Sequence, residues 1–263
     1  MRIFREIYNG FVKGGYIGYR LFLKTSRSER ANSKWATLWE FAEPITLAAI
    51  FLVLRQSDIL HFDGGEYPFV LFLISGLMSY QLASSTIIRS LLSIPQNSSI
   101  LDQVNVPAEA LFVTNYLRFL MDSAIMFFVT IVVVVVFAQI SFMSAIISFL
   151  ILQLLGLGAV GVGMFLAPIN VLYGDISQIV TLLIRPIMFI SPIFYSDVDS
   201  AILGKINDFN PFAHFLLLYR GSLFNGNLFL PISWWVVLAG SMIILIIAIL
   251  FFHVALPALN RKS

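Results

Sequence analysis

Charged residues inside apolar stretches are the features of this sequence that could do chemistry. Arg185 lies in the run TLLIRPIMFISPIFY, residues 181–195, next to a proline. A charge in such surroundings is costly unless it is paired or meets a ligand, so it predicts a functional site or an ion pair. Other apolar stretches contain further charges of this kind: Arg118, Asp122, Glu40 and Glu43.

The sequence contains no complete motif for catalysis or for nucleotide binding. GLGAVG, residues 156–161, fits G-x-G-x-x-G, but it lies inside an apolar stretch with no strand before it. GYRLFLKT, residues 18–25, has Leu23 where a phosphate-binding loop needs glycine. The three histidines are far apart and predict no metal site: His61, His214 and His253. We expect no enzyme and no cofactor in this chain, with any ATP and Mg²⁺ bound by another chain.

The composition predicts a membrane protein. Of the 263 residues, 59% are hydrophobic and 11% are charged, and the formal net charge is +2. A typical soluble domain has about 25% charged residues. One soluble core could not bury this much apolar surface, whereas a bilayer can solvate it. The chain has no cysteine, which excludes disulfides and thiolate metal sites.

Runs of about 20 apolar residues predict transmembrane helices. We expect an all-α membrane protein, because a spanning helix satisfies its own backbone hydrogen bonds. The glycine-rich part of the fourth stretch favours close approach to a neighbouring helix, through Gly156, Gly158, Ala159, Gly161 and Gly163. The sequence predicts six spans: 35–54, 68–88, 110–137, 143–168, 176–195 and 231–256.

The positions of lysine and arginine predict the orientation of these spans. The first 34 residues contain eight such residues, whereas the segment QSDILHFDGGEY after the first span contains none. The positive-inside rule therefore places both termini of this multi-pass protein in the cytoplasm. The basic residues Arg20, Lys24, Arg27, Arg30 and Lys34 would meet anionic headgroups at the inner surface.

Three regions make up the predicted chain: residues 1–34, one transmembrane domain over 35–256, and a tail over 257–263. The first contains an apolar stripe of helical period, which favours an interfacial helix over a solvated basic tail. Residues 196–230 form an outer segment rich in aromatic residues, which predicts short re-entrant or interfacial helices. The stripe consists of Ile3, Phe4, Ile7, Tyr8, Phe11 and Val12.

This topology puts Asp122 and Arg185 at similar depth, about ten to twelve residues from the cytoplasmic side. Two interpretations follow. Arg185 forms an ion pair with Asp122, or it faces a channel and meets an anionic substrate. The two interpretations are compatible if the ion pair between Arg185 and Asp122 opens when substrate passes.

Five stretches, in order along nearly the whole chain, resemble the membrane subunit of ABC-2-type polysaccharide exporters. Capsular polysaccharide export permeases are the most similar group, and O-antigen and teichoic-acid exporters are close alternatives. Gly174-Asp175 and Pro192 depart from the pattern of the family. The stretches are KWATLWEFAEPI at 34–45, YPFVLFLISGLMSY at 67–80, NSSILDQVNVPAEAL at 97–111, YGDISQIVTLLIRPIMFISPIFY at 173–195 and NPFAHFLLLYRGSLFNG at 210–226.

The resemblance implies a homodimer in the inner membrane of a bacterium that works with two cytoplasmic ATP-binding subunits to export a lipid-linked or otherwise anchored polysaccharide. The lipid-linked end of the polymer is then a second possible contact for the basic residues of the first 34. Periplasmic and outer-membrane partners are a further option. No nucleic acid is implied. The loop 93–106 would form the coupling helix that docks on the ATPase; an ordinary connector is the alternative. The residues expected to make this contact are Ser93, Ile94, Asn97, Ile100, Leu101, Asp102 and Val104.

A conduit for a sugar polymer needs aromatic faces on which the rings stack. Most of the 25 phenylalanines will instead face lipid or other helices. An ATP-independent transporter is the main competing class, and it would predict internal symmetry that the sequence does not show. The expected pathway residues are Arg185, Tyr80, Phe189, Phe194, Tyr195, Phe212 and Tyr219.

Overall fold

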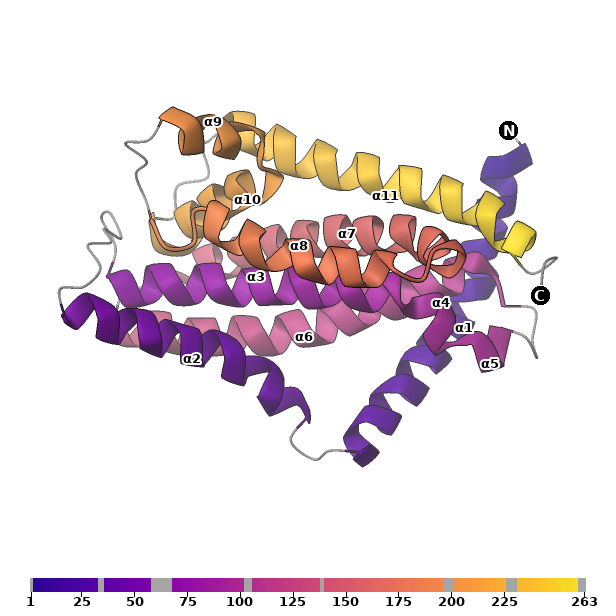
Figure 1. Ribbon diagram of the computed structural model, residues 1–263, viewed down its shortest axis with the longest axis horizontal. Helices are drawn as coiled ribbons and strands as arrows, with labels where there is room; N and C mark the ends of the chain where they lie inside the picture. Colours follow the sequence, from indigo (N-terminus) through magenta and orange to yellow (C-terminus); the bar gives the residue numbers. More distant parts are fainter. Residues whose placement is uncertain are drawn as a thin grey trace.

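A computed structural model describes residues 2–32, 36–57, 68–101, 106–137, 140–195, 201–225 and 231–259. Within these ranges the secondary structure is helical, with no strand. Helices α3 (Phe69–Leu91), α6 (Ala108–Phe137), α7 (Phe142–Leu172) and α11 (Pro231–Leu259) run along the long axis of the molecule (Figure 1). Their contacts are mainly apolar, with polar contacts at a few points, among them that of Asp122 on α6 with Arg89 on α3.

Four of the six predicted spans are helices long and apolar enough to cross a membrane: α3, α6, α7 and α11. Helix α8 (Ile176–Ile190) is apolar but has only 15 residues, because the chain leaves the helix at Ser191-Pro192. Helix α2 (Ala36–Gln56) coincides with the first predicted span and contains Pro44 and charged residues. The all-α prediction is confirmed for the described residues, whereas six crossings remain a prediction.

Helix α7 lies at the centre and contacts α3, α6 and α11. Its glycines face these neighbours, as the sequence predicts. A Cβ atom at Gly156 would lie 2.1 Å from the Phe119 ring on α6, and one at Gly163 would lie 2.5 Å from the Ile87 carbonyl oxygen on α3. These positions hold glycine because any side chain would push the helices apart.

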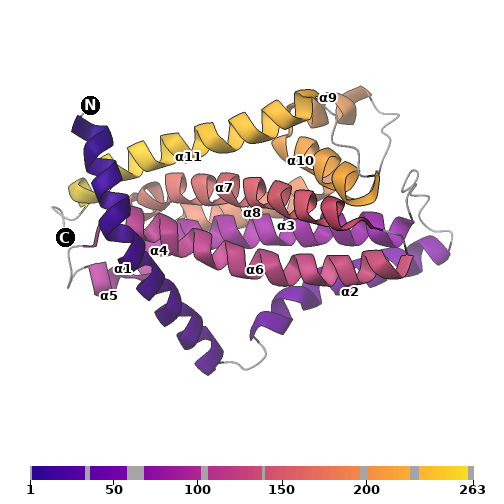
Figure 2. The ribbon, with the colours of Figure 1, turned by 180° about the vertical axis from the view of Figure 1, so that it is seen from behind.

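Helix α1 (Arg2–Asn32) crosses the bundle at one end and packs along the start of α6 (Figure 2). Its contact face is made of Gly10, Gly14 and Gly18, spaced four residues apart. Thr114 on α6 donates a hydrogen bond to the Gly18 carbonyl oxygen at 3.0 Å. On the predicted apolar stripe, Tyr8 and Val12 remain exposed. Phe11 of the same stripe packs into an apolar cluster with Leu111 and Phe112 of α6, and the side chains of Ile3 and Phe4 lie outside the described residues. The long N-terminal helix is therefore observed, and its position in the membrane interface stays a prediction.

The start of α1 and the end of α11 lie at the same end of the bundle (Figures 1 and 2). There the His253 side chain of α11 and the buried Glu109 carboxylate of α6 are 3.0 Å apart. The same carboxylate is packed against Gly10 of α1. These contacts of Glu109 join α1 and α11 to α6.

The opposite end of the bundle carries short helices, where the sequence predicts them in the outer segment. Helix α9 (Ala201–Phe209) and helix α10 (Pro211–Arg220) are followed by a turn of π-helix, Gly221–Asn225. The Asn210 side chain caps α10 by accepting a hydrogen bond from the backbone N–H of Phe212 at 3.0 Å. Helix α10 packs against α11, α7 and α3, so part of this segment returns into the bundle.

Candidate functional site

A groove of about 680 Å³ lies between α2, α3 and α8. One wall consists of Glu43 and Pro44 from α2, and the other of Arg185 and Phe189 from α8. The floor is α3, which contributes Tyr80, Gln81, Ser84, Ser85 and Arg89. The helical period places these α3 residues on one face. The groove therefore contains two cations, Arg89 and Arg185, together with several hydrogen-bonding side chains.

Three of the expected pathway residues line this groove: Arg185, Tyr80 and Phe189. Arg185 is exposed on α8, and within the described residues no carboxylate forms an ion pair with it. The Tyr80 hydroxyl donates a hydrogen bond to the Ile184 carbonyl oxygen, one residue before Arg185. This bond ties α3 to α8 and fixes the position of the groove wall.

The other four expected pathway residues lie elsewhere. Phe194 is buried and stacks on Phe51, with ring centroids 4.2 Å apart. Tyr219 is 1% exposed and stacks on Phe215. Both belong to the hydrophobic core and not to the groove, and a place on the pathway stays a prediction for them. An aromatic residue in an apolar run is as well suited to core packing as to a conduit.

Tyr195 and Phe212 lie near the end of the bundle that carries α9 and α10. The Tyr195 hydroxyl donates to the Ile190 carbonyl oxygen and accepts from the Asn207 amide at 3.0 Å. The Phe212 ring packs edge-on against Tyr80, with centroids 5.2 Å apart. These two residues hold the segment after α8 in place and do not line the groove between α2, α3 and α8.

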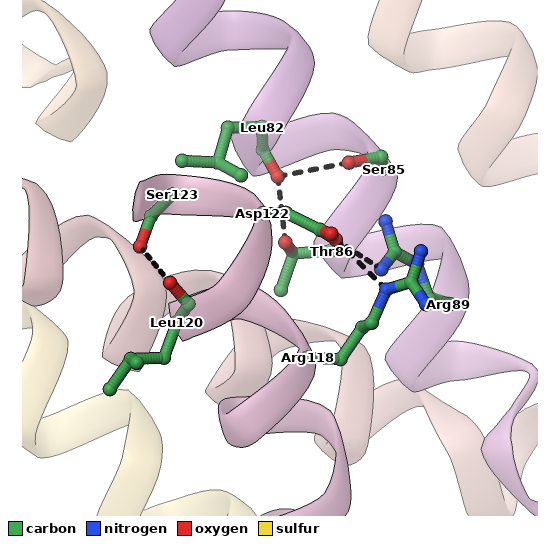
Figure 3. A network of polar contacts seen from close by, with 8 residues as sticks. All are labelled: Leu82, Ser85, Thr86, Arg89, Arg118, Leu120, Asp122 and Ser123. Atoms are coloured by element: carbon green, nitrogen blue, oxygen red, sulfur yellow. Dashed lines mark hydrogen bonds and ion pairs between the residues drawn. The ribbon is translucent and has the colours of Figure 1, made fainter. Parts of the chain in front are cut away.

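A buried charge network lies behind the groove (Figure 3). The Oδ2 atom of Asp122 is 2.5 Å from Nη1 of Arg89 and 3.2 Å from Nε of Arg118. Asp122 is 2% exposed, and its Oδ1 atom has no hydrogen-bond partner. The expected pair between Asp122 and Arg185 is therefore not formed. Arg89 on α3 pairs with Asp122 instead, because α3 packs directly against α6. Helix α8 packs against α3 and α7.

Arg89 lines the groove as well as contacting Asp122, with its side chain 19% exposed. The charged side chains of the groove lining are thus two cations, Arg89 and Arg185, and one carboxylate, Glu43. Among the expected charge partners in α2, Glu43 is exposed and accepts a hydrogen bond from the Gln81 amide at 3.3 Å. The Glu40 side chain lies outside the described residues.

Arg220, at the end of α10, is a functional candidate that the sequence reasoning missed. It is 7% exposed, and its guanidinium lies 3.5 Å from the Phe72 ring centroid. It donates to the carbonyl oxygens of Phe72 at 2.9 Å and of Pro192 at 2.7 Å. The carbonyls freed where Pro192 ends α8 are therefore satisfied by Arg220, which fixes the end of the groove wall. The sequence feature that could have identified it is the one arginine within the apolar stretch 211–224.

The predicted coupling segment forms two single-turn helices, α4 (Ser93–Gln96) and α5 (Ser98–Leu101). Ser93 is buried, and its hydroxyl contacts the Met164 sulfur on α7 at 3.4 Å. Ile94 is also buried against the bundle. These two side chains face the bundle and anchor the segment to it, and their contact with the ATPase stays a prediction.

The exposed face of this segment consists of residues that the sequence reasoning did not select: Pro95, Gln96, Ser98 and Ser99. Asn97 is half-buried, and its amide donates to the Ser93 carbonyl oxygen at 2.8 Å. Ile100 and Leu101 are half-buried. Asp102 and Val104 lie outside the described residues.

Comparison with known proteins gives one consistent result. A sequence model of the ABC-2 type transporter family matches residues 18–224. Two proteins of Klebsiella pneumoniae, both named O-antigen export system permease protein RfbA, are 27% and 26% identical to this chain over 223 residues. The aligned region covers 81% of this chain and 83% of each relative.

Proposed function

Because this chain belongs to the ABC-2 type transporter family, whose membrane subunits work with a separate ATPase, we propose that it is the permease of a cell-surface polysaccharide exporter. The observation that carries this proposal is the polar groove, with Arg185 exposed in its wall, in a family member whose relatives are named O-antigen export permeases. O-antigen is accordingly the first polymer to test. A capsular polysaccharide, which the residue pattern favours, is the second.

The proposed mechanism places the polymer in the groove between α2, α3 and α8. Hydroxyl and amide groups on α3 would exchange hydrogen bonds with sugar hydroxyls, and the exposed Phe189 ring would stack on a sugar face. Arg185 would offset the cost of moving negative charge through a medium of low dielectric constant. Neighbouring weak contacts of this kind let a chain slide, because no single contact holds it.

The conduit would be completed by a second copy of this chain. None of the residues of α8 is buried, and five large apolar side chains on it are more than 40% exposed: Ile179, Leu182, Leu183, Ile187 and Phe189. The groove is open on the side of α8, so one copy alone encloses a polymer only partly. We expect two copies to face each other across this opening, with two ATPase subunits below α4 and α5.

The proposed topology has six crossings with both termini in the cytoplasm of a bacterium and α1 in the inner membrane interface. Helices α3, α6, α7 and α11 account for four of these crossings. Helices α2 and α8 would form the other two. The observation in favour is that the start of α1, the end of α11 and the segment α4–α5 share one end of the bundle (Figure 1).

A complementation experiment tests the function. The chain and its ATPase are expressed in a strain that lacks its own O-antigen permease, and in one that lacks its capsule permease. We expect surface polymer in one of them, and none when the ATPase is inactivated. Arg185→Gln should lower export about tenfold at unchanged protein level, because a mid-membrane cation on the path is worth more than 1 kcal/mol. Lys205→Gln, on the exposed surface of α9, serves as the control. Surface polymer from neither strain, with both subunits in the membrane, would reject the proposal.

A further inference from the structure

The apolar interior of the bundle is divided into two clusters of buried side chains. The larger cluster, here called the main core, joins α2, α3 and α10 to α6 and α7. The smaller cluster, here called the small core, lies where α1 and α4 pack against α6 and α7. Among the described residues, α2, α8 and α10 contribute no side chain to the small core. Its buried side chains include Leu21, Ile94, Leu111, Phe112, Met164 and Phe252.

Specific contacts join the helices of the small core to one another. The Met164 sulfur on α7 lies 3.4 Å from the Ser93 hydroxyl oxygen on α4 and 3.3 Å from the Asn115 amide nitrogen on α6. The Glu109 carboxylate on α6 contacts His253 on α11 at 3.0 Å. Closely packed side chains resist deformation, so these helix ends are expected to move together.

Packing is looser beside the small core. A hollow of about 470 Å³ lies between the end of α3 and the start of α8, and one of about 510 Å³ lies between α7, α8 and α11. Gly240 on α11 lines the second hollow, and a Cβ atom there would have no neighbour within 4 Å. Such spaces let two packed bodies shift against each other, because few side chains have to be displaced.

The small core includes α4, whose exposed side would meet the ATPase. Ile94 anchors α4 in the small core, while Pro95 and Gln96 remain exposed. The backbone N–H of Leu92 donates to the Ile88 carbonyl oxygen at 3.0 Å, so α4 follows α3 without a flexible linker. Helix α3 forms the floor of the groove. A displacement of α4 therefore reaches the groove through α3.

We infer that the small core is a coupling body: ATP binding to the ATPase moves α1, α4 and the adjoining ends of α6, α7 and α11 as one unit against the main core. The docking of the ATPase on α4 rests on the proposed function. The end of α3 then shifts relative to α8, whose middle is held to the main core by the contact between Tyr80 and the Ile184 carbonyl oxygen. The hollow between α3 and the start of α8 provides the space for this shift.

Distances between spin labels in the purified complex with its ATPase, in lipid nanodiscs, test this inference. The chain has no cysteine of its own, so two introduced cysteines carry the labels, and labelled copies are diluted with unlabelled ones. The first pair is Tyr16→Cys on α1 with Val254→Cys on α11, and the second is Tyr16→Cys with Val53→Cys on α2; all three side chains are at least 60% exposed. We expect the first distance to be equal without nucleotide and with ATP held on a hydrolysis-deficient ATPase. The second should change by about 2 Å or more, the size of ordinary helix shifts.

Detaching α1 from the small core gives a functional test. A Cβ atom at Gly18 would lie 2.6 Å from the Ala110 carbonyl oxygen, whereas one at Gly15 would have no neighbour within 4 Å. Gly18→Leu should therefore push α1 away from α6 and lower the polymer exported per ATP severalfold. Gly15→Leu, on the same helix, is the matched control and should leave this ratio unchanged. Equal falls in export and in ATP hydrolysis with Gly18→Leu would show that α1 only stabilises the complex, and would remove it from the coupling body.

The label distances use a fully packed protein, so they decide the inference even if Gly18→Leu fails to assemble. A first distance that changes as much as the second would overturn it, and so would two distances that both stay constant. The distances do not depend on export. No surface polymer in the complementation experiment, with the expected distances, would reject the exporter and leave the coupling body. Normal export with a changed first distance would reject the coupling body alone.

Discussion

Two arginines share one carboxylate oxygen in the interior of this protein, and this arrangement sets the chemistry of the groove at the residue scale. Asp122 accepts contacts from both Arg89 and Arg118, and Arg89 also lines the groove. Arg185 lines the same groove and has no carboxylate partner among the described residues. The position of the Arg89 cation in the groove thus depends on Asp122, a residue that does not line it.

Removing the Asp122 charge should destabilise the fold. Asp122→Asn removes the carboxylate that Arg89 and Arg118 both contact, and breaking a buried ion pair in this way costs about 3–5 kcal/mol. We expect the lower end of that range, because the Arg89 side chain is partly exposed. Thermal unfolding of the purified protein in detergent measures the loss. Asp175→Asn, on an exposed residue whose side chain makes no capping hydrogen bond, is the matched control. Equal melting temperatures for both variants would contradict this account.

At the scale of elements, the bundle depends on the close approach of α7 to its neighbours. Gly156 and Gly163 are the points at which α6 and α3 come nearest to it. A helix with larger residues at these positions would have to lie farther out. That shift would move α3, which forms the floor of the groove.

Gly163→Ala should therefore be destabilising by about 1–3 kcal/mol, because its methyl group would overlap the Ile87 carbonyl oxygen. Gly240→Ala, on α11, should be neutral or stabilising by about 0.5–1 kcal/mol, because it has free space and alanine is the better helix former. Melting temperatures of the two variants, compared with that of the unaltered protein, test the difference. If the two substitutions had the same effect, close helix packing would not explain Gly163.

The exposed turn of α4 and α5 should be the surface that meets the ATPase. Single cysteines at Gln96 or Ser98 should form a cross-link to the ATPase with a short bifunctional reagent, because both side chains are exposed. A cysteine at Ser93 should not, because that position faces α7. The cross-linked product is measured on a denaturing gel. Cross-linking from Ser93 alone would place the docking face on the opposite side of the segment.

At the scale of the whole molecule, the proposed pairing of two copies rests on helix α8, of which no residue is buried. Large apolar side chains on it remain exposed beside the groove, Leu182 the most. In lipid such a face is tolerated, but the polar groove beside it is not, because its charges would face hydrocarbon. Pairing of two copies across the groove removes this conflict.

A cysteine at Leu182, which is 72% exposed on α8, should therefore form a disulfide-linked dimer in membranes under mild oxidation. A cysteine at Phe142, 82% exposed at the start of α7, should remain monomeric. The chain has no cysteine of its own, so each band reports one site. Dimers from Phe142 but not from Leu182 would place the interface elsewhere.

The sequence by itself determined the helical membrane class and the family, because both depend on residue type and order along the chain. Hydrocarbon-length apolar stretches can only be helices in lipid, and the glycines of 156–163 already indicated close packing. It also located the short helices after the fifth stretch and the charges Asp122 and Arg185.

Only the tertiary structure decided which of these residues meet. Asp122 contacts Arg89 rather than Arg185 because α3, not α8, lies beside α6, and depth along a span does not reveal which face of a helix is turned to which neighbour. For the same reason Phe194 and Tyr219 entered the core while Phe189 remained in the groove. Apolar stretches in lipid carry little amphipathic contrast, so the rotation of each helix is set by packing and not by the pattern of its residues.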